Sequence, residues 1–60
     1  MDAKFEINRD VTAEFRFKLV AVNGKTIAVS EGYSTKDNAL NGIKSVKQNA
    51  AKAVIEDKSV

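Results

Sequence analysis

Three lysines that could contact phosphate groups fall at helical spacing in the second half of the chain. Lys36, Lys44 and Lys47 lie with Leu40 within about 80° of arc on a helix. A row of ammonium groups attracts the backbone of a nucleic acid without regard to sequence. The row has no arginine to read bases and no aromatic side chain to stack on them. A solvated helix edge whose last-turn lysines complement the helix dipole is therefore the simpler interpretation.

A second polar group lies just before this helix. Glu31, Tyr33 and Ser34 come where a strand gives way to a helix, and free N–H groups at a helix start can bind an anion. No glycine-rich phosphate loop is present, and no histidine exists to activate a hydroxyl group. We therefore expect Gly32 to permit a bend, Tyr33 to pack, and Ser34 to cap the helix.

The composition removes most catalytic and metal chemistry. The chain has no histidine and no cysteine, so imidazole and thiolate ligands and the commonest general base are missing. The eight acidic residues are scattered and match no calcium-binding loop. We predict that the protein is not an enzyme and that it has no catalytic residue, no metal site and no cofactor.

The chain of 60 residues is expected to form one domain, residues 1–60, with a core from about 4 to 57. A domain of this size buries a small core, and small folds add a disulfide, a metal or a partner subunit. Without cysteine or histidine, oligomerisation remains. The net charge of +2 is low for a dedicated DNA-binding protein. No run is long enough to span a bilayer and no signal peptide is evident, which predicts a cytoplasmic protein without membrane association.

Alternating polar and apolar residues predict three antiparallel strands in the first half. The segments are 4–8, 14–19 and 25–31, and Asn23-Gly24 suits the tight turn between the second and third. The side chains expected on the apolar face are Phe5, Ile7, Phe15, Phe17, Leu19, Ile27 and Val29. Arg16 and Lys18 are expected on the opposite face, where mixed charges favour contact with solvent.

An amphipathic helix is predicted from Ser34 to about Gln48. Ser34 is the expected N-cap, and Asp37 forms a weak capping box with it. Asn49 is the expected left-handed residue after the helix. Gly42 lies on the sheet-facing side, where it predicts a close contact that a side chain would block.

A last strand is predicted at Ala53-Val54-Ile55, so the element order is β-β-β-α-β. About three residues separate it from the helix. It can pair within its own chain through a crossover, or it can cross to a second copy. Because a short connector favours exchange between subunits, and because a three-stranded sheet leaves its edges open, we predict a homodimer. Ala53, Val54 and Ile55 form its expected interface.

The chain resembles the YegP-like family of small bacterial proteins over about residues 4–57. The residues that carry the resemblance are Ser30-Glu31-Gly32-Tyr33-Ser34-Thr35-Lys36, Ala39, Asn41-Gly42-Ile43-Lys44-Ser45-Val46-Lys47 and Asn49-Ala50. Lys4 to Ile7, Glu14 to Leu19 and Asn23-Gly24 are also similar. The resemblance implies an α+β fold of β3-α-β units, which pair into one sheet with exchanged C-terminal strands. A chain of this length is similar to a single unit.

The resemblance implies no activity, because the function of the family is unassigned. Ala13 departs from the family pattern, since glycine is common there at the end of the first turn. Our leading prediction is a non-enzymatic homodimeric module for binding or interaction. The alternative is a weak, sequence-independent nucleic-acid binder that uses Lys36, Lys44 and Lys47, and an enzyme is the third possibility.

Overall fold

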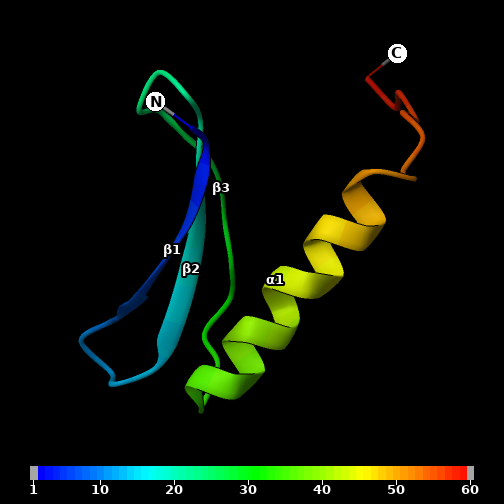
Figure 1. The fold of residues 1–60 in the computed structure, drawn as a ribbon. Coiled ribbons are helices and arrows are strands. Elements are labelled where there is room, and N and C mark those ends of the chain that lie inside the picture. Colours follow the sequence, from blue (N-terminus) through cyan, green and yellow to red (C-terminus); the bar gives the residue numbers. More distant parts are fainter. Residues whose placement is uncertain (1, 60) are drawn as a thin grey trace.

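A computed structural model describes residues 2–59 of the chain. Its elements are β1 (Lys4–Arg9), β2 (Phe15–Val20), β3 (Thr26–Val29) and α1 (Lys36–Ala50). The strands form one antiparallel sheet in the order β1-β2-β3, and α1 lies across one face of it (Figure 1). The predicted α+β class, the meander and the helix are confirmed.

The hairpin of β1 and β2 has the predicted faces. Phe5 lies opposite Leu19, and Ile7 lies opposite Phe17. Because directly opposite residues in an antiparallel pair share a face, these four side chains form one apolar surface. The regular alternation fixes this register, since a slip of one residue would turn the apolar set to solvent.

The turn between β1 and β2 contains a non-glycine residue in the left-handed region. Ala13 has φ 65°, and its N–H donates to the Asp10 carbonyl at 3.0 Å. This backbone conformation costs a residue with a Cβ about 1–2 kcal/mol. The position is the one where the YegP-like pattern favours glycine.

We expect Ala13→Gly to stabilise the fold. Relief of the left-handed conformation outweighs the about 0.4–1 kcal/mol that glycine loses through the greater freedom of the unfolded chain. The net gain is about 0.5–1 kcal/mol in the free energy of unfolding, measurable by urea titration. Ala3→Gly is the matched control, because Ala3 has no positive φ. An equal response of both variants would contradict the strain argument.

The turn between β2 and β3 matches its prediction. Gly24 has φ 85°, and the Asn23 side-chain oxygen accepts from the Lys25 N–H at 3.1 Å. This conformation suits glycine because no Cβ is present to clash.

Strand β3 is shorter than predicted, and two of its side chains do not face inward as expected. Ala28 lies opposite Leu19, and Val29 lies opposite Lys18. The register shifts between Leu19 and Val20, which is a bulge-type irregularity with Ile27 as the additional residue. Ile27 and Val29 are therefore largely exposed. Ala28 takes the inward place beside Leu19.

Helix α1 begins one residue later than predicted. Thr35, not Ser34, is the N-cap, and its Oγ1 accepts from the Asn38 N–H at 3.1 Å. Asp37 lies in the first turn as expected, where its charge complements the helix dipole. The correction arises because both Ser and Thr can cap, and the sequence alone does not distinguish neighbouring caps.

The N-cap assignment gives a direct test. Thr35→Ala is expected to lower the free energy of unfolding by about 1 kcal/mol, because it leaves the Asn38 N–H without its side-chain acceptor. Ser34→Ala is the matched control and is expected to change stability by less than about 0.5 kcal/mol. Chemical denaturation of both variants makes the comparison, and the opposite ranking would restore Ser34 as the cap.

The helix also ends later than predicted. It continues to Ala50, and the C-cap Ala51 is right-handed. Asn49 is helical, and its Nδ2 donates to the Ser45 carbonyl at 2.8 Å. The Asn49 carbonyl accepts from Lys52 and Ala53 N–H groups, which closes the helix without a left-handed residue.

The core lies between β2 and α1. Its buried side chains are Phe17, Val20, Ala39 and Ile43. Phe17 meets Phe5 edge to face and stacks on Tyr33, with ring centroids 6.0 Å apart in both pairs. A Cβ added to Gly42 would lie 2.6 Å from the Tyr33 hydroxyl and 3.1 Å from Phe17 Cε2. The predicted close approach at Gly42 is therefore confirmed.

The predicted last strand is not formed within the described chain. A turn follows the helix, and residues 53–59 have no regular secondary structure. The segment leads away from the sheet beyond the end of α1 (Figure 1). The intrachain crossover is therefore not formed. Among residues 2–59, moreover, we find no helix with the length and apolar character that a membrane span requires.

Candidate interaction surface

Two grooves flank the helix where it rises from the sheet. The first, here called the β3-side groove, has a volume of about 300 Å³. It is lined by Phe5, Phe17, Leu19, Ala28, Val29, Ser30, Glu31, Tyr33 and Val46. The second, here called the β1-side groove, has a volume of about 410 Å³. It is lined by Ala3, Lys4, Phe5, Leu19, Ile43 and Lys47.

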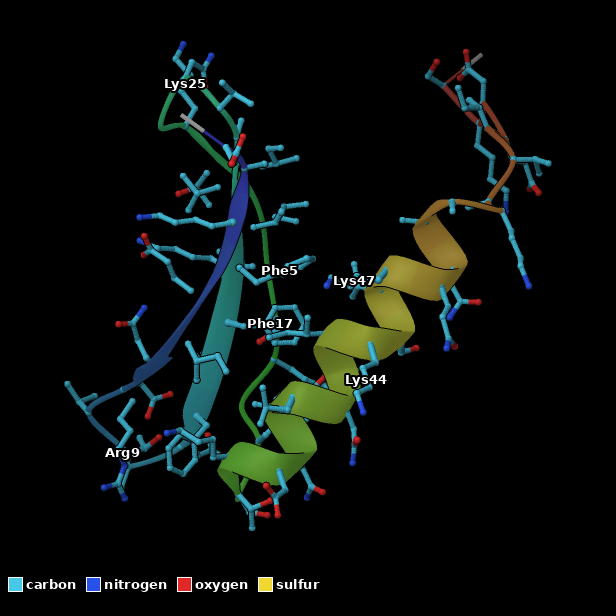
Figure 2. The ribbon with its side chains drawn as sticks, viewed as in Figure 1. Phe5, Arg9, Phe17, Lys25, Lys44 and Lys47 are labelled. Atoms are coloured by element: carbon cyan, nitrogen blue, oxygen red, sulfur yellow. The ribbon has the colours of Figure 1, made fainter. Side chains whose placement is uncertain are left out.

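The grooves exist because one helix covers only part of the apolar sheet face. Phe5 and Phe17 point from the sheet toward α1, and Lys47 lies on the sheet-facing side of the helix (Figure 2). Phe17 is buried, whereas Phe5 and Leu19 are only half-buried. Apolar side chains that remain half-open beside a helix are typical of a surface that another segment covers.

The C-terminal segment is the most exposed apolar part of the molecule after the first turn. Val54 is 86% exposed and Ile55 is 96% exposed. Neither belongs to a helix or strand. The predicted interface residues Ala53, Val54 and Ile55 are therefore available for contact, and their own sheet does not bind them.

Both outer strands of the sheet present backbone groups outward. Phe15 exchanges hydrogen bonds with Tyr33, and the Ser30 N–H donates to the Phe17 carbonyl. Odd-numbered residues of β2 therefore bond toward β3, and even-numbered ones bond toward β1. By this alternation the backbone groups of Phe5 and Ile7 point away from β2, along an edge that a further strand could join.

The predicted lysine edge is only partly assembled. Lys44 and Lys47 line one shallow depression on the outer side of the helix, and Lys36 is not among its lining residues. Asp37 also lines this depression and offsets the positive charge. The depression also exposes Leu40, which gives it a mixed apolar and charged character.

The residues at the strand–helix junction have structural roles. Tyr33 stacks on Phe17 and forms a backbone bridge with Phe15. Gly32 approaches the Glu14 side chain, since an added Cβ would lie 2.5 Å from Glu14 Oε1. Ser34 does not cap the helix. These contacts explain Gly32 and Tyr33 through packing, as the sequence indicates.

The outer sheet face carries exposed ion pairs. Arg16 Nε lies 2.6 Å from Asp10 Oδ2, and Lys18 Nζ lies 3.6 Å from Glu6 Oε1. Lys4 Nζ lies 3.0 Å from the other oxygen of the same glutamate. Such pairs contribute little each at a solvated surface. The face has the polar, charge-balanced character that was predicted for it.

Asp10 organises the first turn, a role that the sequence analysis missed. Its Oδ1 accepts from the N–H and hydroxyl of Thr12 and from the Glu14 N–H, at 2.9, 2.7 and 3.0 Å. Hydrogen bonds from Thr12, and then from Arg16, hold the pKa of Asp10 well below its ordinary value. The available signal was an aspartate followed by threonine two positions later, which favours a side-chain-closed turn.

The depressed pKa predicts acid sensitivity. Since the folded-state pKa of Asp10 lies below the unfolded value, the stabilisation is complete above 3.8 and declines as the pH falls below it. We expect Asp10→Asn to lower stability near neutral pH and to flatten this acid decline. Thr12→Ala should flatten it in part. Urea titrations at a series of acidic pH values measure both effects, and equal slopes for wild type and Asp10→Asn would contradict the assignment.

The described residues do not gather into a reactive centre. Across residues 2–59, no group of three acidic, histidine or cysteine side chains is placed to hold a metal ion. The same residues contain no buried side-chain nitrogen or oxygen that lacks a hydrogen-bond partner. The features that point toward a ligand are instead the apolar grooves, the open sheet edge and the exposed C-terminal segment.

Fold and surface together define a small α+β unit with an incompletely covered sheet. Residues 10–57 match the family described as a domain of unknown function (DUF1508). The chain belongs to this family. The resemblance to YegP-like proteins is thereby confirmed, and the family description assigns no function.

Curated relatives carry the same family relationship. A UPF0339 protein of Treponema denticola is 49% identical over 55 residues, which cover 92% of this chain and 95% of the relative. The UPF0339 protein YegP of Escherichia coli O157:H7 is 46% identical over 46 residues, which cover 77% of this chain and 42% of YegP. The chain therefore spans less than half the length of YegP, and 45% of the length of another relative.

A solved structure supports the fold. The solution structure of a protein from Haloferax volcanii matches with a TM-score of 0.85 and 40% sequence identity. The match covers 93% of this chain and 95% of that chain. Because Haloferax is an archaeon, the fold is not confined to bacteria, which widens the range implied by the resemblance.

Proposed function

We propose that the chain works as a non-enzymatic homodimeric interaction module. In this dimer the Ala53-Val54-Ile55 segment of each chain pairs with the sheet of the other. The observation that supports it most strongly is the exposure of Val54 and Ile55, at 86% and 96%, beside a sheet whose apolar face is only partly covered. Its proposed setting is the cytoplasm.

Energetics favour this arrangement over an exposed tail. Burial of a valine or isoleucine side chain contributes about 1.5–3 kcal/mol. A small domain depends on such terms, since its own core is limited. Exchange also pairs backbone groups that an edge strand otherwise leaves to water. Each chain would contribute its tail and receive one, as two-fold symmetry requires.

The oligomeric mass tests this proposal. Light scattering or sedimentation at micromolar concentration should give twice the chain mass of 6.5 kDa. A dilution series then yields the dissociation constant of the dimer. A mass of one chain at these concentrations would overturn the proposal.

The alternative function is weak, sequence-independent nucleic-acid binding through Lys36, Lys44 and Lys47. The observation that favours it is the shared depression lined by Lys44 and Lys47. Binding of this kind weakens steeply with salt, whereas an apolar protein contact does not. If wild type binds nucleic acid and exchange of the three lysines for glutamate leaves retention unchanged, this alternative is excluded. If wild type shows no retention at low salt, it also fails.

A further inference from the structure

The two grooves beside the helix differ in charge. The β1-side groove combines Phe5, Leu19 and Ile43 with two lysines, Lys4 and Lys47. The β3-side groove has a similar apolar lining, but its charged residue is Glu31. Within residues 2–59, Lys47 forms no ion pair, so its charge is available to a partner.

The C-terminal segment has the complementary pattern. Val54 and Ile55 are followed at once by Glu56 and Asp57. In the single chain Glu56 meets only the neighbouring Lys58, at 3.2 Å and in an exposed position, where such a pair contributes little. The segment thus offers an apolar pair and then an acidic pair. The β1-side groove offers an apolar floor and two lysines, whereas Glu31 would repel the acidic pair in the β3-side groove.

The two sheet edges also differ in their suitability for strand addition. Strand β1 has six residues in regular register with β2. Strand β3 has four residues and a register shift beside it. Short and bulged edges resist pairing with another strand, whereas a long regular edge permits it. Backbone geometry therefore selects the same side of the molecule as charge does.

We infer that the β1 edge and the β1-side groove receive residues 53–57 of a second copy of this chain. The incoming segment lies along Phe5 and Ile7, and its acidic pair meets Lys4 and Lys47. This inference rests on the proposed homodimer and adds the side of the sheet and the recognition chemistry. The chain's own tail leads away from the sheet beyond the helix end, which favours a second copy as the occupant (Figure 1).

A spin label on the tail locates its binding site without knowledge of the register. The chain has no cysteine, so Ser59→Cys provides a single attachment point. Labelled chains without ¹⁵N are mixed in denaturant with ¹⁵N wild-type chains and refolded together. We expect broadening of the amide signals of Phe5, Ile7 and Arg9, and much less broadening at Ile27 and Val29. Reduction of the nitroxide is the control and should restore the signals.

Charge exchange tests the recognition. Glu56→Lys with Asp57→Lys is expected to raise the dimer dissociation constant about tenfold, because exposed ion pairs contribute about 0.2–1 kcal/mol each. Lys4→Glu with Lys47→Glu should do the same. The fourfold variant should return to within about threefold of wild type. Lys25→Glu with Lys36→Glu is the matched control and should leave the constant unchanged.

The outcomes separate this inference from the homodimer on which it rests. A dimeric mass with broadening on the β3 edge, or without recovery in the fourfold variant, overturns the inference and leaves the homodimer standing. A mass of one chain overturns both. If β1 broadens only when the label and ¹⁵N are on the same chain, the tail folds onto its own sheet and the inference also fails.

Discussion

Replacement of both Val54 and Ile55 by aspartate is expected to convert the proposed dimer into single chains. Each buried side chain contributes about 1.5–3 kcal/mol, and two pairs are lost per dimer, so the dissociation constant should rise a hundredfold or more, as a rough minimum. Sedimentation at micromolar concentration should then give 6.5 kDa. The added aspartates also deepen the effect, because a charge cannot be buried without a partner.

The matched control for this variant is Val11→Asp. Val11 is fully exposed, like Val54 and Ile55, but it lies in the turn between β1 and β2. Its replacement should leave the mass of the assembly unchanged. If both variants dissociate equally, the effect is one of net charge and not of the C-terminal segment. If neither variant dissociates, the C-terminal segment is not the interface.

The same variant should also lose stability. A protein whose folding is coupled to association becomes more stable as its concentration rises. Wild type is therefore expected to show a denaturation midpoint that increases with protein concentration, whereas the Val54→Asp, Ile55→Asp variant should show none. A wild-type midpoint independent of concentration would indicate that the single chain is the folding unit.

The hairpin could be predicted from sequence because its signals are local. Strict alternation from Glu14 to Leu19 fixes which side chains share a face, and Asn23-Gly24 fixes the following turn. Both are properties of adjacent residues. The helix was predictable for the same reason, through its period and its polar start. Only its ends were displaced, since several residues near each end can terminate a helix.

The faces of β3 could not be predicted because they depend on pairing. Alternation placed Ile27 and Val29 inward, but the register shift near Leu19 and Val20 brings Ala28 opposite Leu19. A bulge is a feature of two strands together, and no residue of β3 announces it. Its consequence is functional, because an irregular edge leaves β1 as the better edge for a partner.

The candidate site was predictable in its parts but not in its geometry. The sequence marked Ala53, Val54 and Ile55 as an unattached apolar segment. It could not reveal that Lys47 and Lys4, distant in sequence, line one groove. It could not separate Lys36 from Lys44 and Lys47 either, since all three share a helical arc. Position relative to the sheet, which sequence periodicity does not contain, decides both.

Gly42 is the position inside the single chain where substitution should cost most relative to its size. In a solvated helix alanine would be favoured over glycine by about 1 kcal/mol. Here a Cβ would lie 2.6 Å from the Tyr33 hydroxyl, 3.0 Å from its Cζ and 3.1 Å from Phe17 Cε2. Tyr33 cannot easily retreat, because its ring stacks on Phe17 and its backbone is bridged to Phe15.

We therefore expect Gly42→Ala to lower the free energy of unfolding by about 1 kcal/mol, and Gly42→Leu by about 3 kcal/mol or more, since overpacking outweighs the helix propensity. Asn41→Ala, on the exposed neighbouring position, is the control and should change stability by less than about 0.5 kcal/mol. Urea titrations at one fixed protein concentration provide the comparison. Stabilisation by Gly42→Ala would show that the helix moves freely on the sheet.

A double-mutant cycle identifies the clashing atom. Tyr33→Phe removes the hydroxyl that lies nearest the added Cβ and leaves the ring carbons in place. In that background Gly42→Ala should cost less, with a coupling energy of about 0.5–1 kcal/mol. Recovery should be partial because Phe17 and the remaining ring still crowd the site. Additive effects would mean that the Tyr33 hydroxyl moves aside without cost, and that the requirement for glycine arises from Phe17 alone.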